Sequence, residues 1–152
     1  MPQSTQDLNK AVVKRFGEAS NAKDFDAIAA LVAPNFVRHC QATPDVVVQN
    51  RAQFLAFLKA DAAMVPDSRQ TLQQLVAEGD RVAFLITYEG TQEGPFGPFP
   101  PSHKRMELDV SGIFRLRDGL LAELWLTWDN LAALAQLGHF PPSPTRRERG
   151  AA

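Results

Sequence analysis

The spacing of apolar residues changes at Pro66, and this change constrains the fold more than any other feature of the sequence. Before Pro66 the apolar residues recur every three or four positions, which is typical of amphipathic helices. After Pro66 they mostly alternate with polar residues, which is typical of strands with one buried face. Helices followed by a run of strands predict an α+β domain.

The segment before Pro66 predicts three helices and one short strand. Ser4 and Asp24 stand where N-caps are expected, because their side chains can accept hydrogen bonds from free backbone amides. Pro34 and Pro66 are expected to end the second and third helices. The predicted ranges are helix 5–20, a second helix after Asp24, strand 35–40 and helix 51–65.

The segment after Pro66 predicts four strands and a last helix. Tight turns at Gly79-Asp80 and Asp118-Gly119 are typical of hairpins, so these strands are expected to be antiparallel. A strongly twisted antiparallel sheet wrapped around three to four helices leaves a hollow suited to a small molecule. The predicted ranges are strands 70–78, 81–91, 104–117 and 120–128 and helix 130–137.

Length and charge limit the classes of function. The 152 residues fit one domain, expected over 1–140 with a loose C-terminal tail over 141–152. The net charge of −1 argues against a nucleic-acid partner, which requires a basic surface. Without a signal-like N-terminus, a long apolar run or a second cysteine beside Cys40, we expect a cytoplasmic protein without membrane contact. No His or Cys spacing indicates a metal site, so we expect no metal.

A series of short motifs runs along the chain: Phe36-Val37-Arg38-His39, Val65-Pro66-Asp67, Ala77 to Val82, Gly90 to Gly94, Pro100-Pro101, Ile113 to Gly119, Glu123-Leu124-Trp125, Asp129-Asn130-Leu131 and Gln136-Leu137-Gly138. In this order they resemble those of the SnoaL-like polyketide cyclase (ester cyclase) family of the nuclear transport factor 2-like superfamily. The resemblance implies a cystatin-like cone and a homodimer formed through the outer face of the sheet. It also implies intramolecular aldol ring closure by acid–base chemistry, without metal or cofactor.

Two residues are candidates for catalysis. Asp129 follows an apolar strand, and a carboxylate in apolar surroundings can serve as a base near neutral pH because desolvation disfavours its charged form. The resemblance places the family's catalytic acid/base here, although an Asp directly before a helix is also a favoured N-cap. His39 can protonate a developing alkoxide. Its alternative role is that of a hydrogen-bonded structural residue at the end of a strand.

The predicted substrate pocket is mostly aromatic and suits an apolar or aromatic carbonyl compound. Trp125 and Asp129 share one face of their strand, and Trp128 lies on the other, where it could belong to a subunit interface. A bulge would upset that assignment. Gly112 is expected to leave space in the pocket. The candidate pocket residues are Phe36, Phe57, Tyr88, Gly112, Phe114 and Trp125.

Two further features leave alternatives open. The Gly- and Pro-rich segment 90–103 is either a pocket rim or a surface connection whose Phe96 and Phe99 enter the core. Gly112 and Leu124 stand where characterised family members often carry polar residues. That departure favours a noncatalytic small-molecule binding protein as the second hypothesis, with a hydratase or isomerase as the third.

Overall fold

The protein is described here over residues 2–140 of a computed structural model, and the expected tail over 141–152 lies outside the described residues. All the predicted helices and strands are present, and the first strand begins earlier than predicted, at Val32. The elements in chain order are α1 (Thr5–Ala22), α2 (Phe25–Leu31), β1 (Val32–Cys40), α3 (Arg51–Met64), β2 (Arg69–Glu78), β3 (Arg81–Thr91), β4 (Arg105–Arg117), β5 (Leu120–Trp128) and α4 (Asn130–Gln136).

Local side-chain caps fix where the helices start. The Ser4 hydroxyl accepts a hydrogen bond from the Asp7 amide at 3.1 Å and starts α1. The Asp24 carboxylate accepts one from the Ala27 amide at 3.0 Å and starts α2. Both predicted caps are therefore confirmed.

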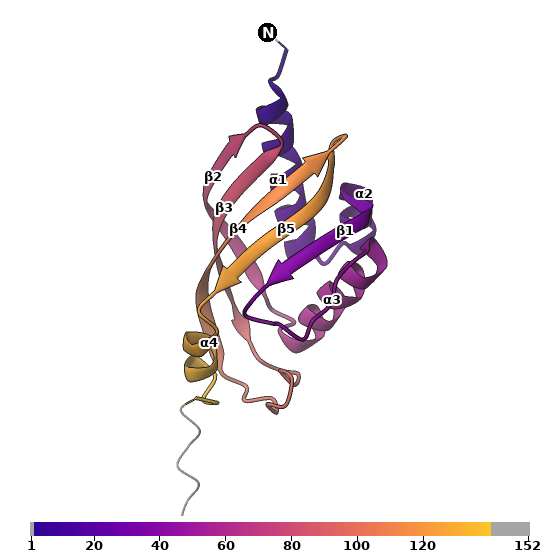
Figure 1. Ribbon diagram of the computed structural model, residues 1–152. Coiled ribbons are helices and arrows are strands. Elements are labelled where there is room, and N and C mark those ends of the chain that lie inside the picture. Colours follow the sequence, from indigo (N-terminus) through magenta and orange to yellow (C-terminus); the bar gives the residue numbers. More distant parts are fainter. Residues whose placement is uncertain (1, 141–152) are drawn as a thin grey trace, which may run out of the picture.

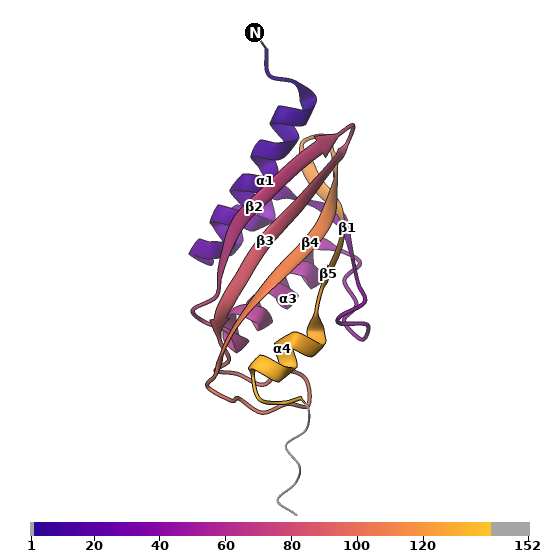
Figure 2. The ribbon, with the colours of Figure 1, turned by 90° about the vertical axis from the view of Figure 1, so that its left-hand side faces the viewer.

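The five strands form one curved sheet in the order β1-β5-β4-β3-β2. All neighbours are antiparallel except β1 and β5, which pair in parallel. Figures 1 and 2 show α1 and α3 against the same face of the sheet, while α4 and the loop between β3 and β4 lie together at one end. This is the predicted cone with helices in the hollow of a curved sheet.

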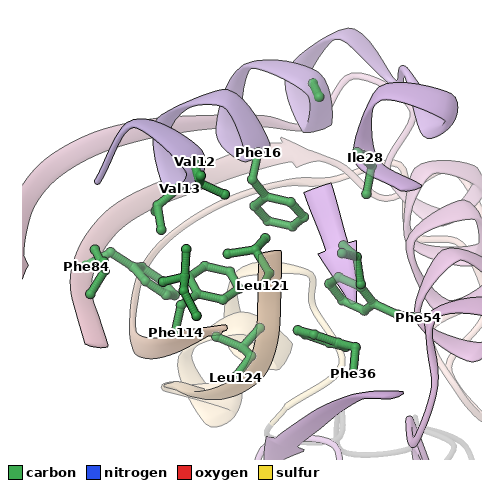
Figure 3. Packing of buried hydrophobic residues seen from close by; sticks show 14 of the residues in the cluster. Val12, Val13, Phe16, Ile28, Phe36, Phe54, Phe84, Phe114, Leu121 and Leu124 are labelled. Atoms are coloured by element: carbon green, nitrogen blue, oxygen red, sulfur yellow. The ribbon is translucent and has the colours of Figure 1, made fainter. Parts of the chain in front are cut away.

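Stacked phenylalanines join the helices to the sheet. The Phe36 ring of β1 stacks on the Phe54 ring of α3 with centroids 4.2 Å apart. The Phe16 ring of α1 meets Phe54 at 6.0 Å and the edge of Phe114 at 5.4 Å (Figure 3). Such pairs add to the stabilisation that comes from burying the apolar area itself. The cluster fixes one end of the space between helices and sheet.

A bulge in β5 decides which of its side chains face the helices. Arg115 pairs with Glu123 and Leu116 pairs with Leu121, so Ala122 is an extra residue without a partner. One extra residue moves every later side chain of a strand to the opposite face. Beyond the bulge, the side chains of Leu124, Leu126 and Trp128 therefore face inward.

No helix in the described part of the chain has the length and apolarity needed to cross a membrane.

Candidate functional site

A cavity of about 850 Å³ lies between the helices and the inner face of the sheet. This size suits a small organic ligand. Its wall is largely apolar and aromatic, contributed by α1, α3, the inner sides of β2 to β5, and the loop after β3. Aromatic and aliphatic lining residues include Phe16, Phe57, Leu72, Phe84, Ile86, Phe114, Leu126 and Trp128.

Asp61 places a carboxyl group in this apolar wall. It lies on α3 four residues after Phe57, so both side chains are on one face of the helix. The hydroxyl of Tyr88 on β3 donates a hydrogen bond to Asp61 Oδ2 at 3.0 Å. Burial raises the pKa of Asp61, while the hydrogen bond from Tyr88 and the charges of Lys23 and Arg38 act in the opposite direction. Asp61 is therefore a carboxyl group poised to exchange protons nearer neutral pH.

Tyr88 is tuned by the same surroundings. Burial, together with the neighbouring Asp61 carboxyl, raises the pKa of the Tyr88 phenol above its ordinary value. The phenol therefore stays protonated and remains a hydrogen-bond donor. The pair joins a proton acceptor to a fixed donor at the cavity wall.

Arg38 contributes a positive charge to the same cavity. Its side chain comes from β1 and is only 6% exposed. The guanidinium lies over the Phe57 ring at 4.2 Å and donates a hydrogen bond to the Thr43 hydroxyl at 3.1 Å. Burial lowers the pKa of Arg38, but an arginine remains protonated across the physiological range.

The loop between β3 and β4 forms one rim of the cavity through Pro95, Phe96, Pro98 and Phe99. The fully buried side chain of Gln92 holds this loop together. Its amide donates to the carbonyls of Gly94 and Pro100, and its oxygen accepts from Ser102 and His139. Of the two interpretations of this segment, the structure supports the rim.

Half of the predicted pocket residues line the cavity. Phe57, Tyr88 and Phe114 do so. Phe36 is absent from the lining because its fully buried ring is packed on Phe54. Gly112 opens no space, which corrects the prediction. An added methyl group there would lie 2.7 Å from the Phe84 ring and 2.5 Å from the Trp125 carbonyl oxygen.

The two tryptophans of β5 lie on the faces opposite to those predicted. Trp125 is on the outer face, where it stacks on His39 with centroids 5.3 Å apart and lies under the Arg81 guanidinium. Trp128 lines the cavity instead of facing a partner subunit. The physical reason is the bulge at Ala122, which reverses the alternation along β5.

His39 and Asp129 do not meet in the structure, and neither lines the cavity. His39 Nε2 lies 2.7 Å from Glu123 Oε2 on the outer face, where Glu123 also accepts a hydrogen bond from Arg115. Asp129 is exposed and caps α4 by accepting a hydrogen bond from the Ala132 amide at 2.9 Å. The expected placement of this pair at the pocket wall is wrong. Whether either residue takes part in catalysis stays a prediction.

The sequence analysis did not identify Asp61 and Arg38 as site residues, although each is a charged residue in the periodic pattern of buried residues. Asp61 continues the apolar stripe of Phe54 and Phe57 along α3, and a carboxylate in such a stripe is forced toward the core side. Arg38 is two residues after Phe36 and so shares its inward face in β1. In each case the informative signal was a charged residue in phase with buried ones.

Within residues 2–140, no three His, Cys, Asp or Glu side chains converge in a way that could hold a metal ion.

The chain matches known proteins in sequence profile and in structure. No functionally curated protein matches it in sequence. IdmH from Streptomyces antibioticus, provisionally described as a polyketide cyclase, is 31% identical with a TM-score of 0.75, over 86% of this chain and 98% of that one. AclR from Streptomyces galilaeus, provisionally described as a hydroxylase, is 26% identical with a TM-score of 0.78, over 90% of this chain and 100% of that one.

A third solved structure shows the fold alone. It is a Catenulispora acidiphila protein with a ketosteroid isomerase-like fold, 18% identical with a TM-score of 0.72, over 84% of this chain and 92% of that one. The profile of the SnoaL-like polyketide cyclases matches residues 10–137. Together with the cone fold and its large apolar cavity, this match shows that the chain belongs to the SnoaL-like polyketide cyclase family.

Proposed function

We propose that the protein is a cyclase-type enzyme that acts by acid–base chemistry, without a cofactor, on an apolar carbonyl compound bound in the cavity. The observation that supports this most is Asp61, a carboxyl group with a raised pKa in an otherwise apolar wall. Two other carboxylates, Glu18 and Asp45, line the cavity from exposed positions. Asp61 is thus the one of the three whose burial raises its pKa and makes it a stronger base than an exposed carboxylate.

The proposed reaction is an intramolecular aldol closure or a related proton transfer. Asp61, in its ionised form, takes the proton from a carbon next to a carbonyl. That carbon then attacks a second carbonyl of the same molecule, forming the new carbon–carbon bond and an alkoxide. Protonated Asp61 returns its proton to the alkoxide, so no proton is gained or lost. Tyr88 holds the carboxyl in position throughout by its hydrogen bond.

A second candidate function is noncatalytic binding of a small molecule. Leu124 lines the cavity and Gly112 is covered by Phe84, so neither position supplies a polar group to a ligand. A binding protein would hold the carbonyl compound without moving its protons. A hydratase or isomerase would use the same carboxyl as a proton carrier.

Proton exchange on a simple ketone separates these functions. We would dissolve the protein with 2-tetralone in D₂O and follow the loss of the α-proton signal by NMR. The enzyme hypothesis predicts exchange faster than in buffer, and a loss of about 10²- to 10⁴-fold in Asp61→Asn. Binding of 2-tetralone without faster exchange would instead support the binding protein.

We also infer that two copies of the chain pair through the outer face of the sheet. The argument rests on a cross-strand apolar row formed by Val76, Ala83, Ile113 and Trp125. Val76 on the edge strand β2 is 63% exposed and Ile113 on β4 is 40% exposed, so the row presents a contiguous apolar patch to solvent. Analytical ultracentrifugation should show a dimer that Ile113→Asp dissociates. A wild-type monomer at tens of micromolar would contradict the inference.

A further inference from the structure

Arg38 is a buried cation that lacks a counter-ion among the described residues. Its guanidinium donates a hydrogen bond to the neutral Thr43 hydroxyl and faces the ring of Phe57. No carboxylate within residues 2–140 comes within 4.0 Å of it, whereas Arg115 on the other face of the sheet has Glu123 at 3.1 Å. Buried charges are normally paired, so this exception points to a partner that is absent from the chain itself.

The neighbouring groups do not neutralise this charge. Asp61 lies on the same wall and its charge acts on Arg38, but its carboxyl group is hydrogen-bonded to Tyr88 and forms no ion pair with the guanidinium. Cys40, two residues along β1, also lies beside the guanidinium, but a thiol is only a weak hydrogen-bond partner. Asp45 is exposed on the loop after β1. The guanidinium therefore reaches the cavity with N–H groups still free to donate.

We infer that the cavity binds an organic oxyanion, namely an apolar carbonyl compound whose carboxylate or ionised 1,3-dicarbonyl group pairs with Arg38. A flat anion with its charge spread over two oxygens matches the fork of the guanidinium, and its apolar remainder matches the aromatic wall. A phosphate fits less well, because Arg38 is the only buried cation among residues 2–140 and the other cation of the lining, Lys14, is exposed. The inference rests on the proposed function for the reacting carbonyl, but the charge of the ligand is argued from Arg38 alone.

Matched ligands that differ only in charge test the inference. Calorimetric titration at pH 7.5 would compare 2-naphthoate with methyl 2-naphthoate. A second arm would compare ionised 2-phenyl-1,3-indandione with its 2-methyl derivative, which cannot ionise. We expect at least one anion to bind roughly 10- to 100-fold more tightly than its neutral partner, since charge-assisted hydrogen bonds have about this effect. The arm with the larger ratio identifies the source of the oxyanion. Equal binding within both pairs would overturn the inference.

Variants assign the preference to Arg38. Arg38→Met should abolish the difference between anion and neutral partner, and Arg38→Lys should keep part of it. The matched control Arg115→Met, on the other face of the sheet, should keep all of it. Preference for the anion that survives in Arg38→Met would overturn the inference. Asp61→Asn should retain the preference while losing proton exchange, so failure of the proposed catalysis is distinguishable from failure of anion binding.

The stability of the free protein gives an independent readout. A buried guanidinium without a partner costs folding energy, so Arg38→Met should melt at the same temperature as the wild type or higher. Added 2-naphthoate should raise the melting temperature of the wild type but not of Arg38→Met. A strongly destabilised or unfolded Arg38→Met protein would show that Arg38 has a structural partner, and would contradict the inference.

Discussion

Arg38 and His39 are neighbours in β1, yet they belong to different environments. Arg38 faces the cavity, is 6% exposed and has no counter-ion in the described part of the chain. His39 faces outward, with a side chain that is 46% exposed, and is paired with Glu123 at 2.7 Å. Successive side chains of a strand point to opposite faces. Arg38 is therefore a buried charge without a counter-ion, while the next residue, His39, is hydrogen-bonded at the surface.

The comparison teaches that a satisfied polar cluster is weak evidence for function. On the outer face, Glu123 already receives hydrogen bonds from both His39 and Arg115, so these groups have few free donors for a ligand. On the inner face, Arg38 and Asp61 lie in an apolar wall and can still form hydrogen bonds with a ligand. Functional groups are more often found where the protein leaves charges unbalanced.

The largest change in stability is expected from adding one methyl group at two glycines that face the inner side. Gly112→Ala places its methyl group 2.5 Å from the Trp125 carbonyl oxygen, so we expect destabilisation of about 1 to 3 kcal/mol. Gly17→Ala, in the middle of α1 with open space around it, should stabilise by about 0.5 to 1 kcal/mol. Urea denaturation measures both. Equal changes in the free energy of unfolding for the two variants would contradict this, because they would mean that the space around Gly112 is as open as that around Gly17.

A smaller effect is expected from Tyr88→Phe, which tests whether the Tyr88 hydroxyl influences the pKa of Asp61. Loss of the hydrogen bond raises the pKa of Asp61 further, since that bond favours the ionised carboxylate. The 2-tetralone exchange rate should rise with pH through the pKa of Asp61, above the ordinary 3.8, and Tyr88→Phe should move this rise to higher pH. If the midpoint of the pH profile does not move in Tyr88→Phe, Tyr88 does not act on the group that exchanges the proton.

The smallest effect is expected on the outer face. Hydrogen bonds from His39 and then Arg115 lower the pKa of Glu123 below its ordinary 4.5. A carboxylate with a lowered pKa stabilises the fold above its unfolded-state pKa, and this contribution disappears as the pH falls through its folded-state value. Glu123→Gln should therefore cost less than about 1 kcal/mol at pH 7 and nothing at pH 2. A loss of several kcal/mol in the free energy of unfolding, measured by urea denaturation at pH 7, would contradict this. It would show that the cluster of His39, Arg115 and Glu123 stabilises the fold more than expected for an exposed cluster.

The fold could be predicted from the sequence because its local signals agree with one another. The caps Ser4 and Asp24 and the turn at Asp118-Gly119 all stand where the structure uses them. Alternation in β4 also correctly identified the buried face that carries Val110 and Phe114. The homodimer stays a prediction.

The candidate site could be predicted only in part, because it depends on register. Regular pairing from Arg117 and Leu120 onward would place Trp125 opposite Gly112, on the inner face. The bulge at Ala122 instead pairs Gly112 with Leu126 and turns Trp125 outward. The residue types around Ala122 do not indicate a bulge. The same shift leaves Asp129 as an exposed helix cap and turns Trp128 into the cavity.

The central claim is that proton chemistry belongs to the inner face, and one measurement addresses it most directly. It is the α-proton exchange rate of 2-tetralone with Asp61→Asn, Asp129→Asn and His39→Gln measured side by side. The account predicts a loss of about 10²-fold or more in Asp61→Asn and rates near wild type in the other two. Loss of exchange in Asp129→Asn or His39→Gln, with Asp61→Asn still active, would contradict it.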